Sequence, residues 1–287
     1  MPSMADARKP ALDNSAISGT GVRLTQRRNV KLRLLPSSFE HDGSASARQH
    51  LTCFVVNGRV AFDAGSLAMG LSDQEGREVR DIVLTHAHLD HVAGLPLFLD
   101  DHFATLTEPV RVHAAEEVIE VLERDIFNWS VYPRFSELRN ANGPVIEYVP
   151  FSNGVEFEAG ELRIRPLSVN HKVPSSGFLI ADGVSTIALT GDTSSMKGFW
   201  SALENVAELD ALLIECAFPD ELNELADMSH HLTPSALAME LKTFGRTECP
   251  KYVVNIKPAY RAKVVSELEA LRIENLHILE VGQTYTW

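Results

Sequence analysis

Cysteine is scarce in this chain, and long apolar runs are missing from it. Its three cysteines, Cys53, Cys216 and Cys249, are widely spaced and lie in or beside apolar runs. This pattern is typical of reduced core thiols rather than of a disulfide framework. No apolar run approaches the ~20 residues that a membrane-spanning helix needs. We therefore expect a cytoplasmic protein without a membrane span.

Basic residues are also few: Lys and Arg number 26 against 39 acidic residues, a formal net charge of -13. An extended nucleic-acid-binding face needs clustered Lys and Arg, so this balance argues against one. A small anionic substrate stays compatible with it, because bound metal ions can reverse the local sign of an acidic pocket.

The length and composition are those of an ordinary globular protein, with 287 residues, 45% of them apolar and 23% charged. Residues 1–28 contain no apolar stretch of signal-peptide length, and we expect a flexible N-terminal arm there. Residues 29–287 are predicted to form a single domain.

Short β-type runs recur along the chain, and helical patterns are interleaved with them mainly in the second half. Apolar positions predict helices around Phe199, Leu237 and Val264; the second has Thr233 as a cap and Gly245 as a stop. This order indicates two sheets with helices packed outside them. The predicted strands are residues 30–35, 51–56, 59–62, 81–85, 110–113, 145–149, 162–169, 177–180, 186–190, 211–215, 251–256 and 277–280.

An aromatic insertion at residues 125–144 interrupts this alternation and carries Phe127, Trp129, Tyr132 and Phe135. Aromatic residues at this density favour a satellite hydrophobic cluster. The alternatives are a lid that stacks on a flat substrate ring and a contact in a homodimer.

The strongest functional signal is the segment from Thr85 to His91, which follows a strand-type apolar run. Side chains alternate along extended backbone, so His86 and His88 face the same way and can share one metal ion. Asp90 and His91 follow where the chain turns into a helix, and a carboxylate beside an imidazole suits a second divalent cation. The alternative is a solvated loop in which Asp90 caps that helix.

The remaining donors are expected at other strand ends. His171 follows a β-type run and is a candidate third imidazole for the first metal, and Asp192 closes another run and could bridge two cations with its two oxygens. Asp63, also at a strand end, could orient a ligand histidine or loop amides, with a structural turn aspartate as the alternative. His231 lies near a helix N-terminus and could protonate a substrate, with a surface histidine as the alternative.

From about residue 30 onward, these residues resemble the metallo-β-lactamase superfamily. The superfamily's metal motif is matched by His86, His88, Asp90 and His91. Asp63 matches its earlier aspartate, His171 its third histidine position and Asp192 its bridging aspartate. The resemblance implies an α/β fold, a four-layer αββα sandwich with metal ions at one edge. Within the superfamily the chain looks most like class II 3′,5′-cyclic nucleotide phosphodiesterases, through residues 86–94, 170–175, 231–234 and 256–258. It departs from their pattern after Leu95, and related tRNA-processing enzymes carry similar motifs.

A second departure concerns Asn255, because similar proteins place a metal-binding histidine there. An amide oxygen is a poorer donor to zinc than an imidazole nitrogen. We therefore expect one or two Zn²⁺ ions, of which the second is labile or is replaced by Mn²⁺ or Mg²⁺.

The hypothesis from the sequence is a metal-dependent phosphodiesterase acting on cyclic AMP or cyclic GMP. Asp90, His231 and Asp192 are the candidate catalytic residues. Lys257 is a candidate phosphate contact, with an ordinary exposed lysine as the alternative. Two alternatives stay open. One is another hydrolysis on the same fold, such as RNA 3′-processing or opening of a lactone, lactam or thioester, and the other is a low-turnover metal-binding sensor.

Overall fold

The computed structural model describes residues 29–287, so the predicted N-terminal arm lies outside the described residues. Two seven-stranded sheets form the centre of the fold. The first contains, in spatial order, β16 (Thr284–Thr286), β1 (Lys31–Leu34), β2 (Phe54–Val56), β3 (Val60–Phe62), β4 (Asp81–Val83), β5 (Val110–Ala115) and β8 (Ile146–Phe151).

The second sheet runs through the second half of the chain. Its order is β15 (Leu276–Ile278), β14 (Lys251–Val254), β13 (Ala211–Glu215), β12 (Thr186–Leu189), β11 (Ser176–Ala181), β10 (Leu162–Ser168) and β9 (Phe157–Ala159). Strands β3, β4, β5 and β8 are parallel, and so are β12 to β15, whereas β9 to β12 and β16 to β3 pair antiparallel.

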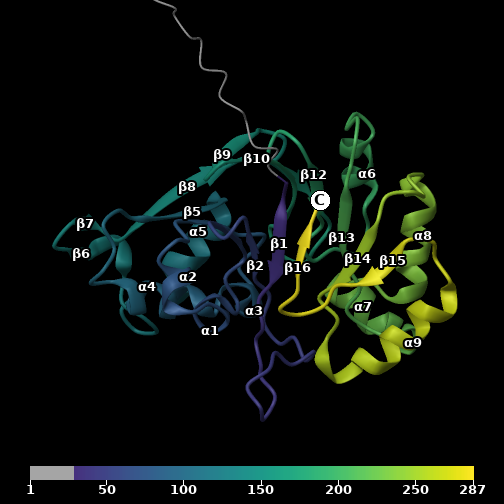
Figure 1. Cartoon of the computed structure of the whole chain (residues 1–287), viewed down its shortest axis with the longest axis horizontal. Helices are drawn as coiled ribbons and strands as arrows, with labels where there is room; N and C mark the ends of the chain where they lie inside the picture. Colours follow the sequence, from purple (N-terminus) through teal and green to yellow (C-terminus); the bar gives the residue numbers. More distant parts are fainter. Residues whose placement is uncertain (1–28) are drawn as a thin grey trace, which may run out of the picture.

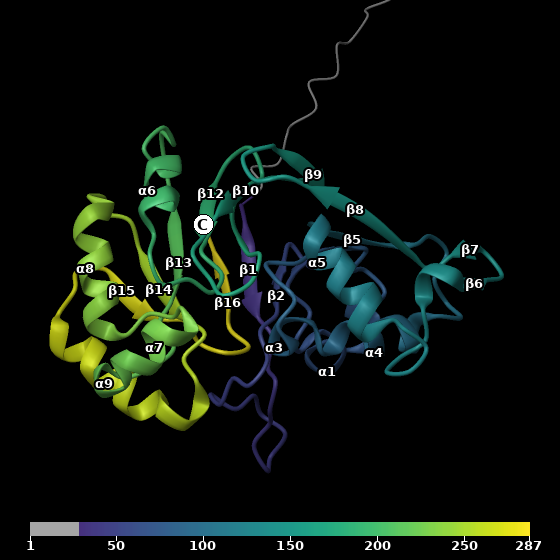
Figure 2. The ribbon, with the colours of Figure 1, turned by 180° about the vertical axis from the view of Figure 1, so that it is seen from behind.

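Helices cover the outer face of each sheet, as the two views of the ribbon show (Figures 1 and 2). Those of the first half are α1 (Leu67–Gly70), α2 (Asp73–Gly76), α3 (Leu89–Val92), α4 (Gly94–His102), α5 (Glu116–Val121), the π-helix η1 (Leu122–Ile126) and the short 3-10 turn η2 (Phe135–Glu137). Those of the second half are α6 (Lys197–Leu203), η3 (Asp220–Leu222), α7 (Asn223–Ser229), α8 (Pro234–Phe244), η4 (Pro258–Tyr260) and α9 (Arg261–Leu271).

Three hydrophobic clusters separate four layers. The middle cluster joins the two sheets face to face, with Phe62 against Phe178 at 5.6 Å between ring centroids. The outer clusters pack the helices of each half against their own sheet, for example Phe98 of α4 and Leu237 of α8. The order is therefore α, β, β, α, and the predicted pair of sheets with helices outside is confirmed.

Local sequence signals explain α8 well. Thr233 has extended backbone and its side chain accepts a hydrogen bond from the Ala236 N–H at 3.4 Å, while Pro234 occupies the first turn. The helix ends at Gly245, whose φ of 68° is a conformation that glycine adopts without strain.

The aromatic insertion mainly completes the first half's core. Phe127 and Phe135 are buried in the outer cluster and meet edge to face at 5.8 Å, whereas Trp129 is 57% exposed. The insertion continues into the hairpin of β6 (Arg139–Asn140) and β7 (Gly143–Pro144), at the end of the molecule away from α8 and α9 (Figure 1). The satellite-cluster interpretation fits this packing, and the dimer contact stays a prediction.

Candidate metal centre

The histidine-rich segment connects β4 to α4 and lies where several strands of both sheets end. Helix α3 begins at Leu89, with His88 in extended conformation before it and no side-chain cap. Asp90 is in the first turn and is therefore not the helix cap that the alternative interpretation required. The loops after β3, β12 and β14 reach the same edge, which brings Asp63, Asp192 and Asn255 to this segment.

Close backbone packing fixes the segment against the loop that follows β3. A Cβ atom at Gly65 would collide with the backbone carbonyl of Asp90 and with the backbone of Thr52. The Thr52 N–H donates to that same carbonyl at 2.8 Å, and the Ala64 N–H donates to the carbonyl of His91 at 2.7 Å. Glycine at position 65 thus permits the contact that places α3.

Three imidazole donor atoms meet at the first predicted metal position, and a carboxylate oxygen lies beside one of them. His86 Nε2 lies 3.0 Å from His88 Nδ1, which lies 3.2 Å from His171 Nε2. Asp192 Oδ2 lies 3.9 Å from His86 Nε2. Three imidazole nitrogens and one carboxylate oxygen are a donor set that suits a tetrahedral zinc-type cation.

The protonation state of these imidazoles also fits a metal ion. Burial lowers the pKa of His86 well below its ordinary value and lowers that of His88. Burial likewise lowers the pKa of His171 to about 4. The three rings are therefore neutral near pH 7, with nitrogen lone pairs free to bind a cation.

Neighbouring groups hold these rings in orientation. The Thr85 hydroxyl lies 2.9 Å from His86 Nδ1, and the carbonyl oxygen of His230 accepts a hydrogen bond from His171 Nδ1 at 3.0 Å. In both rings Nε2 is thereby turned toward the cluster. The left-handed backbone of His230, with φ of 57°, presents that carbonyl.

The second predicted position is built around His91. Its Nδ1 lies 2.6 Å from Asp63 Oδ2, so Asp63 orients a histidine as its place at a strand end suggests. Its Nε2 is buried without a hydrogen-bond partner, 3.4 Å from Asp192 Oδ2 and 4.0 Å from Asp90 Oδ2. Burial disfavours the imidazolium, but Asp192 and Asp63 outweigh it and raise the pKa of His91 well above its ordinary value.

Asn255, predicted as a weak oxygen ligand of the second metal ion, lies between Asp192 and Thr52. Its amide Nδ2 donates to Asp192 Oδ1, and its Oδ1 accepts the Thr52 hydroxyl at 2.6 Å. The other Asp192 oxygen, Oδ2, is the one that faces His86, His91 and His231. Among residues 29–287, three groups of three donors have ligand atoms within 4.8 Å of one another, and none includes Asp90. The groups are His86, His88 and His171; His86, His91 and Asp192; and His171, Asp192 and His231. The first position thus gathers three imidazoles, whereas His91 has only His86 and Asp192 beside it in these groups.

Lys257 meets the carboxylate that the second position would need. Its Nζ donates to Asp90 Oδ2 at 2.9 Å, with both side chains about 30% exposed. Burial acts to lower the pKa of Lys257, but Asp192 and Asp90 outweigh it and raise that pKa.

The structure adds one residue that the sequence analysis did not select, Glu215 at the end of β13. Its buried carboxylate accepts a hydrogen bond from His231 Nδ1 at 2.8 Å and another from the Thr193 N–H at 2.9 Å. Despite burial, this partner raises the pKa of His231, whose Nδ1 lies 3.9 Å from Asp192 Oδ2. His231 is 92% buried, so the surface-histidine alternative is wrong. The sequence did carry a signal for Glu215, because it is a charged residue at the end of the otherwise apolar strand 211–215.

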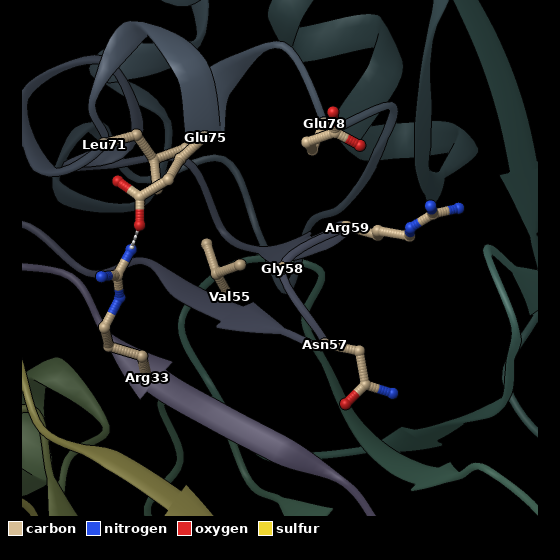
Figure 3. A pocket seen from close by; sticks show the side chains of 8 residues that line it. All are labelled: Arg33, Val55, Asn57, Gly58, Arg59, Leu71, Glu75 and Glu78. Atoms are coloured by element: carbon tan, nitrogen blue, oxygen red, sulfur yellow. Dashed lines mark hydrogen bonds and ion pairs between the residues drawn. The ribbon is translucent and has the colours of Figure 1, made fainter. Parts of the chain in front are cut away.

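A separate hollow of about 290 Å³ lies over β1, β2 and α2 (Figure 3). Its charged groups include Arg33, whose guanidinium donates to Glu75 at 2.6 Å, and it is lined by no histidine or cysteine. The side chains that could bind a metal ion gather instead around His86, His171 and Asp192.

Comparisons with known proteins agree with this geometry. A sequence model described as a beta-lactamase superfamily domain matches residues 59–248. The chain is 29% identical over 227 residues to a probable 3′,5′-cyclic-nucleotide phosphodiesterase of Yersinia pestis, covering 67% of this chain and 63% of that protein. It is 26% identical over 136 residues to a chloroplastic tRNase Z of Arabidopsis thaliana, covering 46% of this chain and 34% of that protein. The chain thus spans less than two thirds of the length of either relative.

Among solved structures, the metallo-beta-lactamase fold protein YhfI from Bacillus subtilis superposes with a TM-score of 0.70 at 16% identity. The superposition covers 91% of this chain and 100% of YhfI. It shows the fold. No helix in residues 29–287 is long and apolar enough to span a membrane.

Proposed function

The chain belongs to the beta-lactamase superfamily, a family of metallohydrolases, and we propose that it is a metal-dependent phosphodiesterase acting on 3′,5′-cyclic nucleotides such as cyclic AMP and cyclic GMP. The observation that carries the proposal is the Glu215–His231 pair beside the donor cluster, with 2.8 Å between Oε1 and Nδ1. The sugar oxygen that leaves in such a reaction needs a proton, and this pair is built to supply one.

The residues that hold the metal ion are, in this proposal, His86, His88, His171 and Asp192, with Zn²⁺ as the ion favoured by three imidazoles and one carboxylate. A divalent ion held by these residues would lower the pKa of a water molecule and offset charge on a phosphoryl oxygen. The Thr85 hydroxyl and the His230 carbonyl orient the His86 and His171 rings at this position, and Asp63 orients the neighbouring His91 ring.

His231 is the proposed proton donor. Glu215 accepts from Nδ1, so Nε2 is the nitrogen that can hold a proton toward the leaving oxygen. Glu215 also stabilises the imidazolium, because a buried carboxylate at hydrogen-bond distance favours the charged ring. Asp192 lies next to the same ring and keeps the proton donor beside the donor cluster.

RNA 3′-processing is the second candidate, and the similarity to the chloroplastic tRNase Z favours it. The net charge of -13 weakens it, because a tRNA needs a basic docking surface. We also propose a cytosolic location, because the three cysteines are buried and unpaired.

The test is an assay of purified, zinc-loaded protein on cyclic AMP, cyclic GMP, bis(p-nitrophenyl) phosphate, a tRNA precursor and a lactone. We expect turnover of the cyclic nucleotides. Lactone or tRNA turnover without cyclic-nucleotide hydrolysis would reject the proposed substrate class while leaving a metal-dependent hydrolase. Binding of metal without any turnover would favour the sensor.

A further inference from the structure

We propose that the ammonium group of Lys257 takes the place of a second metal ion in this centre. The inference rests on the proposed function only in treating the cluster as the catalytic centre. Asp90 and His91 have the spacing of ligands for a second cation. In the structure, however, Asp90 pairs with Lys257, and Asp192 accepts a hydrogen bond from Asn255.

Three of the four side chains expected at the second position, Asp90, Asp192 and Asn255, each have one oxygen in a hydrogen bond. Asp90 Oδ2 accepts the Lys257 ammonium at 2.9 Å. Asp192 Oδ1 accepts the Asn255 amide, whose own oxygen accepts the Thr52 hydroxyl at 2.6 Å. What remains for a cation is His91 Nε2, the shared Asp192 Oδ2 at 3.4 Å from it, the His86 nitrogen of the first position and the second oxygen of Asp90. Two of these donors, His86 and Asp192, are shared with the first position, the expected imidazole is replaced by Asn255, and Asp90 is already paired with a cationic side chain. The position is therefore poorer in free donors than the first one and already carries a positive charge.

The backbone fixes where the ammonium lies. Lys257 follows the end of β14 and precedes Pro258, which favours the extended backbone found there, with φ of -63° and ψ of 127°. Its N–H donates to the Ala217 carbonyl at 3.1 Å. Asn255, two residues earlier, has φ of 62°, a left-handed conformation that asparagine tolerates better than most residues. Asn255 and Lys257 thus reach Asp192 and Asp90, respectively, from a single turn.

The chemistry also matches. In a two-metal site the second cation offsets the negative charge of carboxylates and of the phosphoryl group. A lysine ammonium is a compact point charge that binds phosphate oxygens. The side chain is 29% exposed, so it remains reachable from solvent while it pairs with Asp90. One divalent ion and one lysine would then supply three positive charges where two divalent ions supply four.

The test counts metal ions rather than turnover. Wild type, Asn255→His, Lys257→Met, the Asn255→His/Lys257→Met double variant and the control Lys263→Met are dialysed against buffered free Zn²⁺, and bound metal per chain is measured by elemental analysis. Lys263 is a suitable control because it is an exposed lysine of α9 that pairs with Glu267 at 3.5 Å. Thermal melting checks that each variant is folded.

We expect one tightly held ion in wild type and in Lys263→Met. The double variant frees Asp90 and supplies an imidazole, so it should hold two ions. Asn255→His alone should bind the second ion at least about 10-fold more weakly than the double variant, because the ammonium still repels it. Lys257→Met should lose cyclic-nucleotide turnover and regain part of it when millimolar Mn²⁺ is added.

Two tightly held ions in wild type would overturn the proposal, as would equal second-ion affinity in Asn255→His and the double variant. The wild-type count decides even where the double variant fails to fold. Because the count needs no substrate, a chain that binds one ion as expected but leaves cyclic nucleotides intact would refute the proposed function and not this inference.

Discussion

Replacing Glu215 with Gln is the sharpest perturbation of the proposed proton donor. The change keeps the size of the side chain and removes the charge that His231 Nδ1 meets at 2.8 Å. Hydrogen bonds to charged groups contribute about 1.5–3 kcal/mol, and ~1.4 kcal/mol corresponds to a factor of ten in rate. We therefore expect kcat for cyclic AMP to fall by about 10- to 100-fold.

The choice of substrate separates a proton-transfer defect from general damage. Cyclic AMP releases a sugar oxygen that needs a proton, whereas bis(p-nitrophenyl) phosphate releases a phenolate that is stable without one. Glu215→Gln should therefore slow the first substrate much more than the second. Glu240→Gln is the matched control, because Glu240 accepts from Trp200 Nε1 at 2.8 Å, on α8 and outside the metal cluster.

The pH profile gives a second readout. Glu215 raises the pKa of His231, and the acid form of His231 is active, so wild-type activity falls as pH rises through that raised pKa. Without the carboxylate this fall should begin at lower pH. An equal loss on both substrates with an unchanged pH profile would refute the assignment of His231 as the proton donor.

Three further predictions concern metal binding, packing and acid stability. His88→Ala should remove one of the four donors and abolish tight zinc binding and turnover, measured by elemental analysis and cyclic AMP hydrolysis; retained turnover would reject the site. Gly65→Ala should destabilise the fold by about 3 kcal/mol in urea unfolding, because its Cβ collides with the backbone of Asp90, and an unchanged midpoint would contradict that contact. Burial would raise the pKa of Asp81, but hydrogen bonds from His113 and Arg111 outweigh it and lower that pKa to about 2. Above pH ~4 the charged Asp81 therefore adds about 2 kcal/mol to the free energy of unfolding, and this contribution is lost as the pH falls from ~4 to ~2. Asp81→Asn lacks the ionisable group, so its free energy of unfolding should not show this loss in acid unfolding.

Strand ends explain why much of the centre was predictable from the sequence. His86, His88, His171 and Asp192 each follow an apolar strand, and polar residues at such places stand out from the pattern. The periodicity of α8 and its Thr233 cap were equally readable. Short elements such as β9 and β16 were missed, because three residues carry too little pattern to identify a strand.

Partnerships between distant residues were not predictable from the sequence. Glu215 could be placed on a strand, but its pairing with His231 depends on how the loop after α7 returns to β13. Asn255 was expected to offer its oxygen, and only the position of Thr52, 203 residues away in sequence, shows which side of the amide faces Asp192. The ion pair of Lys257 with Asp90 likewise joins the two halves of the fold.

A metal titration of catalysis tests the central claim most directly. Protein stripped with a chelator is titrated with Zn²⁺ while hydrolysis of cyclic AMP is followed by chromatography. We predict no activity without metal and a rise that saturates at one ion per chain. Full activity in the stripped protein, or no hydrolysis with zinc bound, would contradict the account.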